Sequence, residues 1–134
     1  MGREIAAGFL FLRIHFIAFK MARMGPQMAW FFLLIAGMLE IAWAVALPQT
    51  KGFTKLGPSL YVFAVMGVSF FCLSQALRIL PIGTAYAVWT GIGAAGTAIL
   101  GMALLGEPLR PLRIFYILMI VGGTVGLKFL HDRG

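Results

Sequence analysis

The sequence predicts an all-α membrane protein with four transmembrane helices in each subunit. Of its 134 residues, 61% are hydrophobic and only 11% are charged, whereas soluble domains are about half apolar and a quarter charged. A soluble fold of this length would expose far more apolar surface than its core could bury. The apolar residues also fall into four long runs separated by short polar segments. Lipid must therefore cover much of the chain.

The four runs have the length and composition of membrane-spanning helices. Crossing the roughly 30 Å of hydrocarbon takes about 20 residues of α-helix. Helices are expected because lipid offers backbone N–H and C=O groups no hydrogen-bond partners. The first run contains one charged residue, Glu40, the second and third contain none, and the fourth carries Arg113 and Lys128 near its ends. The predicted helices span residues 29–47, 58–77, 82–105 and 112–130.

The three connectors combine helix-breaking residues with charge, as helix ends at a membrane surface require. Residues 48–55 contain Pro, Gly and two Lys, and residues 78–81 contain Arg and Pro. Residues 106–111 contain Gly, Glu, Arg and two Pro. No soluble domain fits between the helices, so residues 28–134 are predicted to form one four-helix domain.

Residues 1–27 differ from the rest of the chain and are interpreted as an N-terminal extension. They contain four cations and an apolar patch, residues 5–12, that is too short to span a membrane. One interpretation is a signal or anchor segment, although no clean cleavage site follows. A second is an amphipathic helix on the membrane surface. A third is that translation begins at Met28, so that the extension is not part of the native protein.

Charge counting favours the start at Met28. Without the extension, three cations lie at the end of the helices that carries both termini and four at the opposite end, so there is almost no orientation bias. The extension raises the first count to seven, which would favour that end in the cytoplasm. The cations are Arg78, Lys128 and Arg133 at the terminal end, Lys51, Lys55, Arg110 and Arg113 opposite, and Arg3, Arg13, Lys20 and Arg23 in the extension.

The net charge of +7 does not indicate nucleic-acid binding, because the cations lie between apolar runs rather than on one face. Cys72 is the only cysteine, so no intramolecular disulfide is expected. His15 and His131 are isolated, and no metal site is predicted. The sequence contains no nucleophile–base set or phosphate-binding loop. We therefore expect neither an enzyme nor a cofactor.

Glu40 is the only acidic residue inside the four predicted spans, about midway along the first. A charge at mid-membrane costs about 2.5–3.5 kcal/mol on insertion scales. Desolvation favours the neutral acid, whereas a neighbouring cation favours the carboxylate. A proton and a cation can thus compete for one group, which is the minimum machinery of an antiporter. The alternative is a structural role, in which a protonated Glu40 hydrogen-bonds a neighbouring helix.

Aromatic and hydroxyl side chains are placed so that they can share a cavity with Glu40. Trp43 lies three residues beyond Glu40 on the same helical face, and Tyr86 and Trp89 have the same spacing on the third helix. Ser69 lies midway along the second helix. Aromatic walls attract a cation, and hydroxyl groups can orient a carboxylate. Ordinary core packing is the alternative for each aromatic residue.

Glycines form a further pattern in three of the predicted helices. Gly37 shares the helical face of Glu40. In the third helix, closely spaced glycines permit close packing and a local bend; they are Gly91, Gly93 and Gly96. In the fourth, Gly122 and Gly126 form a GxxxG step suited to helix–helix contact. Because four helices are few for enclosing a cavity, a dimer is expected, which would bring two copies of Glu40 together.

Several stretches of the chain resemble the small multidrug resistance family, and more closely its guanidinium-exporter (Gdx) subtype. They are AGMLEIAWA at 36–44, GFTK at 52–55, LPIGTAYAVWTGIGA at 80–94 and GEP at 106–108. The resemblance runs from Met28 to about Lys128 and supports Met28 as the natural start. One departure is Pro48, where many relatives carry a lysine.

The resemblance implies a multi-pass protein of the bacterial inner membrane that forms an antiparallel homodimer. Its partners would be guanidinium-type cations and protons, bound in turn between the two Glu40 carboxylates. Ser69, Trp43 and Tyr86 would hold those carboxylates, and Trp89 would line the site. Gly91 and Gly93 would allow a bend in the third helix, and Gly122 and Gly126 would form the dimer contact. Guanidinium suits such a site because its planar N–H forks match carboxylate oxygens.

Two alternative functions are kept open. One is a broader exporter of quaternary-ammonium and other drug-like cations. The other is a membrane partner subunit that transports nothing, for which Glu40→Gln would leave function unchanged. A channel is less compatible with the sequence, because a central proton-binding carboxylate suits alternating occupancy better than rapid flow.

Overall fold

The computed structural model describes residues 25–132, which form four long α-helices and one short 3₁₀ helix. Each long helix is apolar and long enough to cross a membrane, which confirms the predicted fold class. The observed bounds differ from the predicted ones by at most three residues. The predicted extension lies outside the described residues, apart from its last three. The elements are α2 (Pro26–Ala46), η1 (Leu47–Thr50), α3 (Leu56–Ala76), α4 (Ile82–Leu104) and α5 (Pro111–Asp132).

Prolines explain why three helices begin earlier than hydropathy predicts. Pro26 and Pro111 are the first residues of α2 and α5, and Pro58 lies in the first turn of α3. A proline fits the first turn because its φ is already helical and its missing N–H would have no intrahelical partner there. By sequence alone, Pro111 falls in a connector and Pro26 in the extension, whereas Pro58 is the first residue of its predicted helix and α3 begins two residues earlier. The α2 helix therefore begins two residues before Met28.

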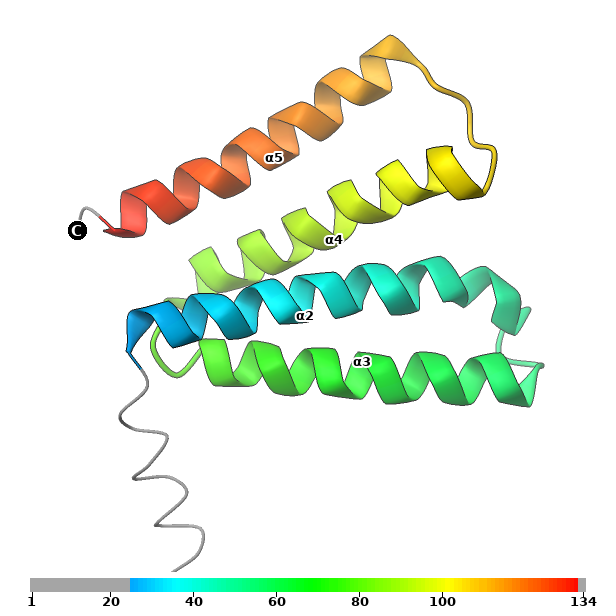
Figure 1. Ribbon diagram of the computed structural model, residues 1–134, viewed down its shortest axis with the longest axis horizontal. Helices are drawn as coiled ribbons and strands as arrows, with labels where there is room; N and C mark the ends of the chain where they lie inside the picture. The colour runs from blue at the N-terminus through cyan, green and yellow to red at the C-terminus, as the bar shows by residue number, and fades with distance from the viewer. Residues whose placement is uncertain (1–24, 133–134) are drawn as a thin grey trace, which may run out of the picture.

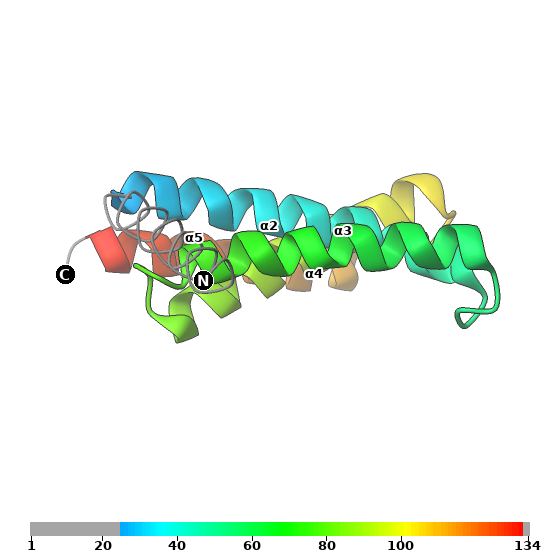
Figure 2. The ribbon, with the colours of Figure 1, turned by 90° about the horizontal axis from the view of Figure 1, so that it is seen from below.

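The helices lie side by side in the order α3, α2, α4, α5 (Figure 1). The α2 helix packs against both α3 and α4, whereas α3 and α4 make few contacts with each other. The α5 helix lies at the edge of the row and packs mainly on α4, and near its C-terminus Lys128 and His131 also reach Trp30 of α2. A perpendicular view shows that the molecule is much thinner in the second direction (Figure 2). A single chain is thus an open row of helices.

The main hydrophobic core lies near one end of the helices themselves, where α2 and α4 begin and α3 ends (Figure 1). Small residues let the three helices approach closely there, and Trp30 and Trp89 fill the space between them. The buried members of this cluster on α2 and α4 all come from the first halves of those helices. Its buried members are Ala29, Trp30, Leu33, Ala36, Cys72, Leu73, Ala76, Leu80, Ala85, Val88 and Trp89.

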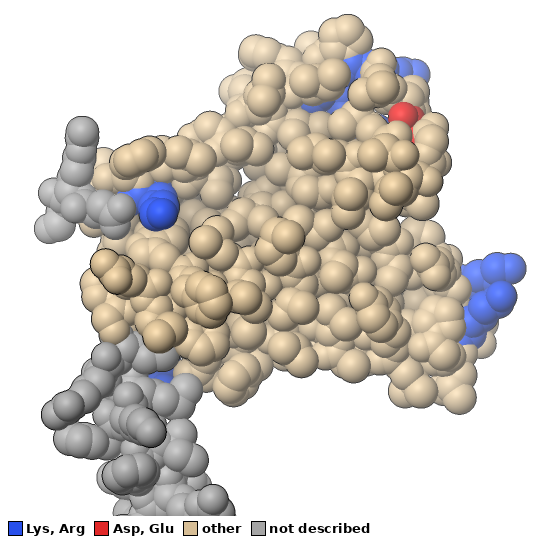
Figure 3. Space-filling model, in the orientation of Figure 1, with Lys and Arg blue, Asp and Glu red and all other residues tan. Residues whose placement is uncertain are grey.

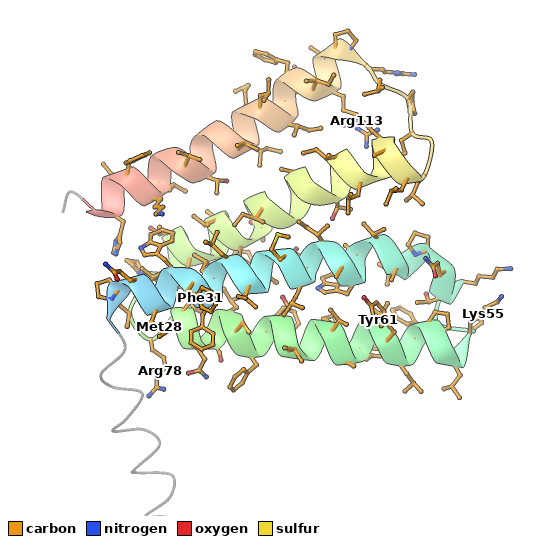
Figure 4. All side chains as sticks on the ribbon, in the orientation of Figure 1. Met28, Phe31, Lys55, Tyr61, Arg78 and Arg113 are labelled. Carbon is orange, nitrogen blue, oxygen red and sulfur yellow. The ribbon has the colours of Figure 1, made fainter. Side chains whose placement is uncertain are left out.

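The surface is divided as a membrane requires. Lysine and arginine side chains lie at the two ends of the helices, and the face between them shows no charged side chain (Figure 3). Lys55 marks the end where α2 connects to α3, and Arg78 marks the opposite end (Figure 4). Large apolar side chains such as Phe31 and Tyr61 point outward from the helices (Figure 4). This pattern matches a hydrocarbon core between two charged headgroup layers.

Candidate functional site

The carboxyl group of Glu40 lies in the middle of α2 and packs against Gly93 of α4. A β carbon added at Gly93 would overlap the carboxyl carbon and Oε2 of Glu40. Only glycine leaves room for the acid between the two helices at this point. The glycine predicted to permit a bend in α4 therefore also makes the space in which Glu40 lies.

Two further contacts set the register between α2 and α4. A β carbon at Gly37 would lie 2.7 Å from Ile92, and one at Gly96 would overlap Ile41. Residue numbers rise together along the two helices in these pairs, so α2 and α4 run in the same direction. Glycine and bulky side chains thus alternate across the interface on both sides of Glu40. The close approach holds the acid at mid-helix against α4.

One turn before Glu40, the carbonyl oxygen of Ala36 collects hydrogen bonds from two other helices. Ser69 Oγ on α3 donates to it at 2.8 Å, and Trp89 Nε1 on α4 donates to it at 3.3 Å. Trp89 Nε1 also lies 3.3 Å from Ser69 Oγ. In an α-helix this carbonyl also accepts the backbone N–H of Glu40, four residues later. The cluster therefore links all three helices to the turn that carries the acid.

Tyr86 and Trp89 meet at the surface of α4. Their rings form an edge-to-face pair with centroids 5.3 Å apart. Trp89 is 4% exposed, whereas Tyr86 is 53% exposed. The two predicted site aromatics therefore share one wall, but only Trp89 is buried within the single chain. Tyr86 presents its ring away from the core of its own subunit.

Among the described residues, four buried side-chain atoms lack a hydrogen-bond partner, and one of them is Trp30 Nε1 near the start of α2. The other three belong to Glu40 or to residues one turn beyond the contact between Glu40 and Gly93. They are Glu40 Oε2, Trp43 Nε1 and Thr97 Oγ1. A buried polar atom without a partner costs about 1–3 kcal/mol, so such a group marks a place where water or a ligand is needed. Thr97 was not among the residues predicted from the sequence. The sequence does place Thr97 four residues after Gly93, on the same helical face, and this spacing could have identified it.

The structure brings some predicted site residues together and leaves others apart. Ser69 and Trp89 meet at Ala36, and neither is hydrogen-bonded to Glu40. Gly91 packs against Thr124 of α5. Gly122 and Gly126 have open space beside them. The roles predicted for these residues in a dimer stay predictions.

The described residues offer no group of three or more potential metal-ligating side chains of the His, Cys, Asp and Glu types. The chemistry available at Glu40 is therefore that of a carboxyl group beside an indole and a hydroxyl. A carboxyl group in this position can bind a proton or a cation.

Four membrane-spanning helices with one mid-membrane acid define a small multi-pass membrane transporter. The chain belongs to the small multidrug resistance family, because the model described as Small Multidrug Resistance protein matches residues 28–120. This family membership places it in the bacterial inner membrane.

Relatives within the family carry a more specific name. The chain is similar to proteins named guanidinium exporter from Citrobacter freundii and Salmonella typhimurium, at 56% identity over 101 residues. The match covers 75% of this chain and 96% of each relative. It is also similar to the guanidinium exporter of Yersinia pseudotuberculosis, at 52% identity over 101 residues, 75% of this chain and 97% of the relative. The resemblance stated from the motifs is thereby confirmed.

Proposed function

We propose that this protein exports guanidinium and related small guanidinyl cations in exchange for protons. The observation that carries the proposal is the Glu40 carboxyl group, held at mid-membrane against Gly93 with Oε2 buried and unpaired. Among the described residues it is the only acid within a span and away from a helix end. The names of the relatives support guanidinium as the substrate.

The exchange follows from what one buried carboxyl group can bind. When protonated, Glu40 is neutral and suits the apolar surroundings. When a guanidinium cation arrives, the planar N–H forks match the carboxylate oxygens, and the proton must leave. Proton and cation thus occupy the same group in turn. Trp43 on the next turn of α2 supplies an aromatic wall for the cation.

We further propose that two chains assemble as an antiparallel homodimer with both Glu40 residues at the shared site. A single chain is an open row of helices in which the Glu40 side chain is only partly buried. The α5 helix is almost fully exposed, including the face that carries Gly122 and Gly126. Tyr86, half-exposed beside Trp89, is available to the partner subunit's half of the site. Two facing carboxylates would share their protons, so their titration would belong to the pair.

Within the site, Ser69 and Trp89 act through the backbone. Their hydrogen bonds to the Ala36 carbonyl fix the turn of α2 that precedes Glu40, and so orient the acid. Gly91 and Gly93 allow α4 to bend where it approaches α5 and α2 respectively. In this proposal Tyr86 and Trp43 contact the carboxylates or the substrate directly.

The test is guanidinium exchange by the full-length chain in proteoliposomes under an imposed pH gradient. When the vesicle interior is more acidic than the medium, we expect guanidinium to accumulate inside against its own concentration gradient while protons move out. Glu40→Gln removes the titrating group with little change in volume, and exchange should fall to the level of empty vesicles. Glu107→Gln is the matched control, because this acid lies in the α4–α5 connector and pairs with Arg113. Exchange by Glu40→Gln at the normal rate would refute the proposal.

The description of the family model favours one second candidate, a broader exporter of drug-like cations. The same vesicles distinguish the two. Guanidinium should drive proton release, and a bulky quaternary ammonium should not. If only the bulky ion were transported, guanidinium export would be refuted and the broader drug-cation exporter supported. If neither cation exchanges with protons, the chain would be a non-transporting partner subunit instead.

The start of the native protein at Met28 remains a proposal of its own. The family match begins at residue 28. The intact mass of the protein expressed from its own upstream region would test it directly.

A further inference from the structure

Thr97 differs from other threonines in the same helices. A helical threonine commonly donates its hydroxyl proton to a carbonyl of the preceding turn. Thr90 does so to the Tyr86 carbonyl at 2.9 Å, and Thr124 does so to the Ile120 carbonyl at 2.8 Å. Thr97 Oγ1 makes no such bond, although it is buried. No described residue forms a hydrogen bond with this hydroxyl group, so the group is available to a bound ligand.

The packing of α2 on α4 places Thr97 beside the turn of α2 that follows Glu40. Gly93 faces Glu40 and Gly96 faces Ile41, in helices that run in the same direction. Thr97 lies one turn beyond Gly93 on the same face of α4. Trp43 lies one turn beyond Glu40 towards the same end. The unpaired atoms of Glu40 and Thr97 thus belong to adjacent turns of the interface between α2 and α4, and Trp43 lies on the turn of α2 that follows Glu40.

The three unpaired atoms have distinct hydrogen-bonding capacities. Glu40 Oε2 accepts when ionised, Thr97 Oγ1 can accept or donate, and Trp43 Nε1 can only donate. Every N–H of guanidinium is a donor, so the cation needs acceptors and has no use for the indole N–H. A carboxylate satisfies the N–H groups on one side of the flat cation. In the proposed dimer the second Glu40 carboxylate can satisfy the N–H groups on another side of the cation, and the N–H groups on the third side still need an acceptor.

Resting on the guanidinium exchange proposed above, we propose that Thr97 is a further substrate-contacting residue. Its hydroxyl oxygen accepts a hydrogen bond from an N–H of the guanidinium cation bound at Glu40. Two observations support this proposal. Thr97 Oγ1 is unpaired on the turn next to the one that faces Glu40, and the cation, which has only N–H donors, needs an acceptor. Thr97 thereby favours guanidinium over cations that carry no N–H groups.

The experiment measures guanidinium–proton exchange in proteoliposomes for three substitutions at position 97 in the full-length chain. Thr97→Val keeps the shape but removes the hydroxyl, Thr97→Ala removes it without adding a methyl group, and Thr97→Ser retains it. We expect the KM for guanidinium to rise about tenfold in Thr97→Val and Thr97→Ala with little change in kcat, as for a lost hydrogen bond to a cation. Thr97→Ser should restore the normal KM.

Two controls separate this inference from the proposed function. Thr90→Val removes the hydroxyl that is already bonded to the Tyr86 carbonyl, and its KM should stay normal. Glu40→Gln should abolish exchange altogether. If Glu40→Gln exchanges normally, the proposed function is wrong, whatever position 97 does. If Glu40→Gln is inactive and Thr97→Val and Thr97→Ala both keep a normal KM, only the role of Thr97 is overturned. A loss of kcat shared by all three variants at position 97, without a change in KM, would likewise overturn it in favour of a packing role.

Discussion

Glu40 and Gly93 form a matched pair in which the acid occupies the volume that a side chain at position 93 would take. We expect Gly93→Ala to displace the carboxyl group or force α2 and α4 apart. Guanidinium exchange in proteoliposomes should fall by roughly tenfold or more, because displacing a reacting group by about 1 Å is enough to cause large losses. The variant should still insert, since alanine is a better helix former than glycine.

The control for this pair is Gly83→Ala, in the first turn of the same helix. No atom lies within 4 Å of a β carbon built there. Exchange by Gly83→Ala should match the unmodified protein. Normal exchange by Gly93→Ala would contradict the packing of Glu40 on this glycine.

Ser69 and Trp89 should be energetically coupled, because both donate to the Ala36 carbonyl and they also contact each other. We expect Ser69→Ala to lower the free energy of unfolding by about 1 kcal/mol, a typical value for a hydrogen bond between membrane helices. A double-mutant cycle with Trp89→Phe, measured by SDS-induced unfolding in micelles, should show non-additivity. Ser74→Ala is the control, since its hydroxyl bonds locally to the Phe71 carbonyl. Strictly additive effects would show that the shared carbonyl does not link the pair.

The open face of α5 allows a test of the dimer that does not disturb the monomer. Gly122→Val has room within its own chain, since nothing lies within 4 Å of a β carbon there. If Gly122 and Gly126 form a contact between subunits, the added side chain should reduce the yield of chemically cross-linked dimer at least several-fold, while helical content by circular dichroism stays unchanged. Gly123→Val, also unobstructed but on another face of the helix, should cross-link normally. Equal losses for both variants would argue against a contact specific to the GxxxG step.

The ion pair between Glu107 and Arg113 closes the connector between α4 and α5. Arg113 points from α5 towards α4 (Figure 4), and its side chain and that of Glu107 are 34% and 41% exposed. Because solvent screens such a pair, Arg113→Gln should lower stability by less than about 1 kcal/mol. Thermal unfolding in neutral detergent should show the difference shrinking as salt concentration rises. A loss that is independent of salt would assign Arg113 a packing role instead.

Much of the fold follows from hydropathy, because the membrane imposes one simple requirement on each helix. The four spans were predicted to within three residues. The errors at the starts of the helices involve Pro26, Pro58 and Pro111, because the effect of a proline depends on its position within the helix. The prominence of Glu40 also follows from its isolation among apolar residues. These features are local in the sequence and require no knowledge of packing.

The partners of each site residue could not be predicted in the same way. The resemblance implies that Ser69 holds the carboxylate and that Trp89 lines the site, yet within one chain both donate to a backbone carbonyl. That choice depends on the rotation of α3 and α4 about their axes, which hydropathy leaves undetermined because apolar residues surround these helices on all sides. Thr97 was missed because a hydroxyl in a helix ordinarily bonds its own backbone.

The one-sided core of α2, α3 and α4 also has a consequence for how variation is tolerated along the chain. Replacements that enlarge Ala29, Ala36 or Ala85 meet neighbours that cannot move, because three helices are wedged together there. The opposite halves of the same helices contain fewer buried apolar residues, and changes in bulk are restricted there mainly where glycines of α4 face α2, as at Gly93 and Gly96. A complete substitution survey should therefore show tolerance that increases along the membrane normal, with an interruption at Glu40 and at the glycines of α4 that face α2.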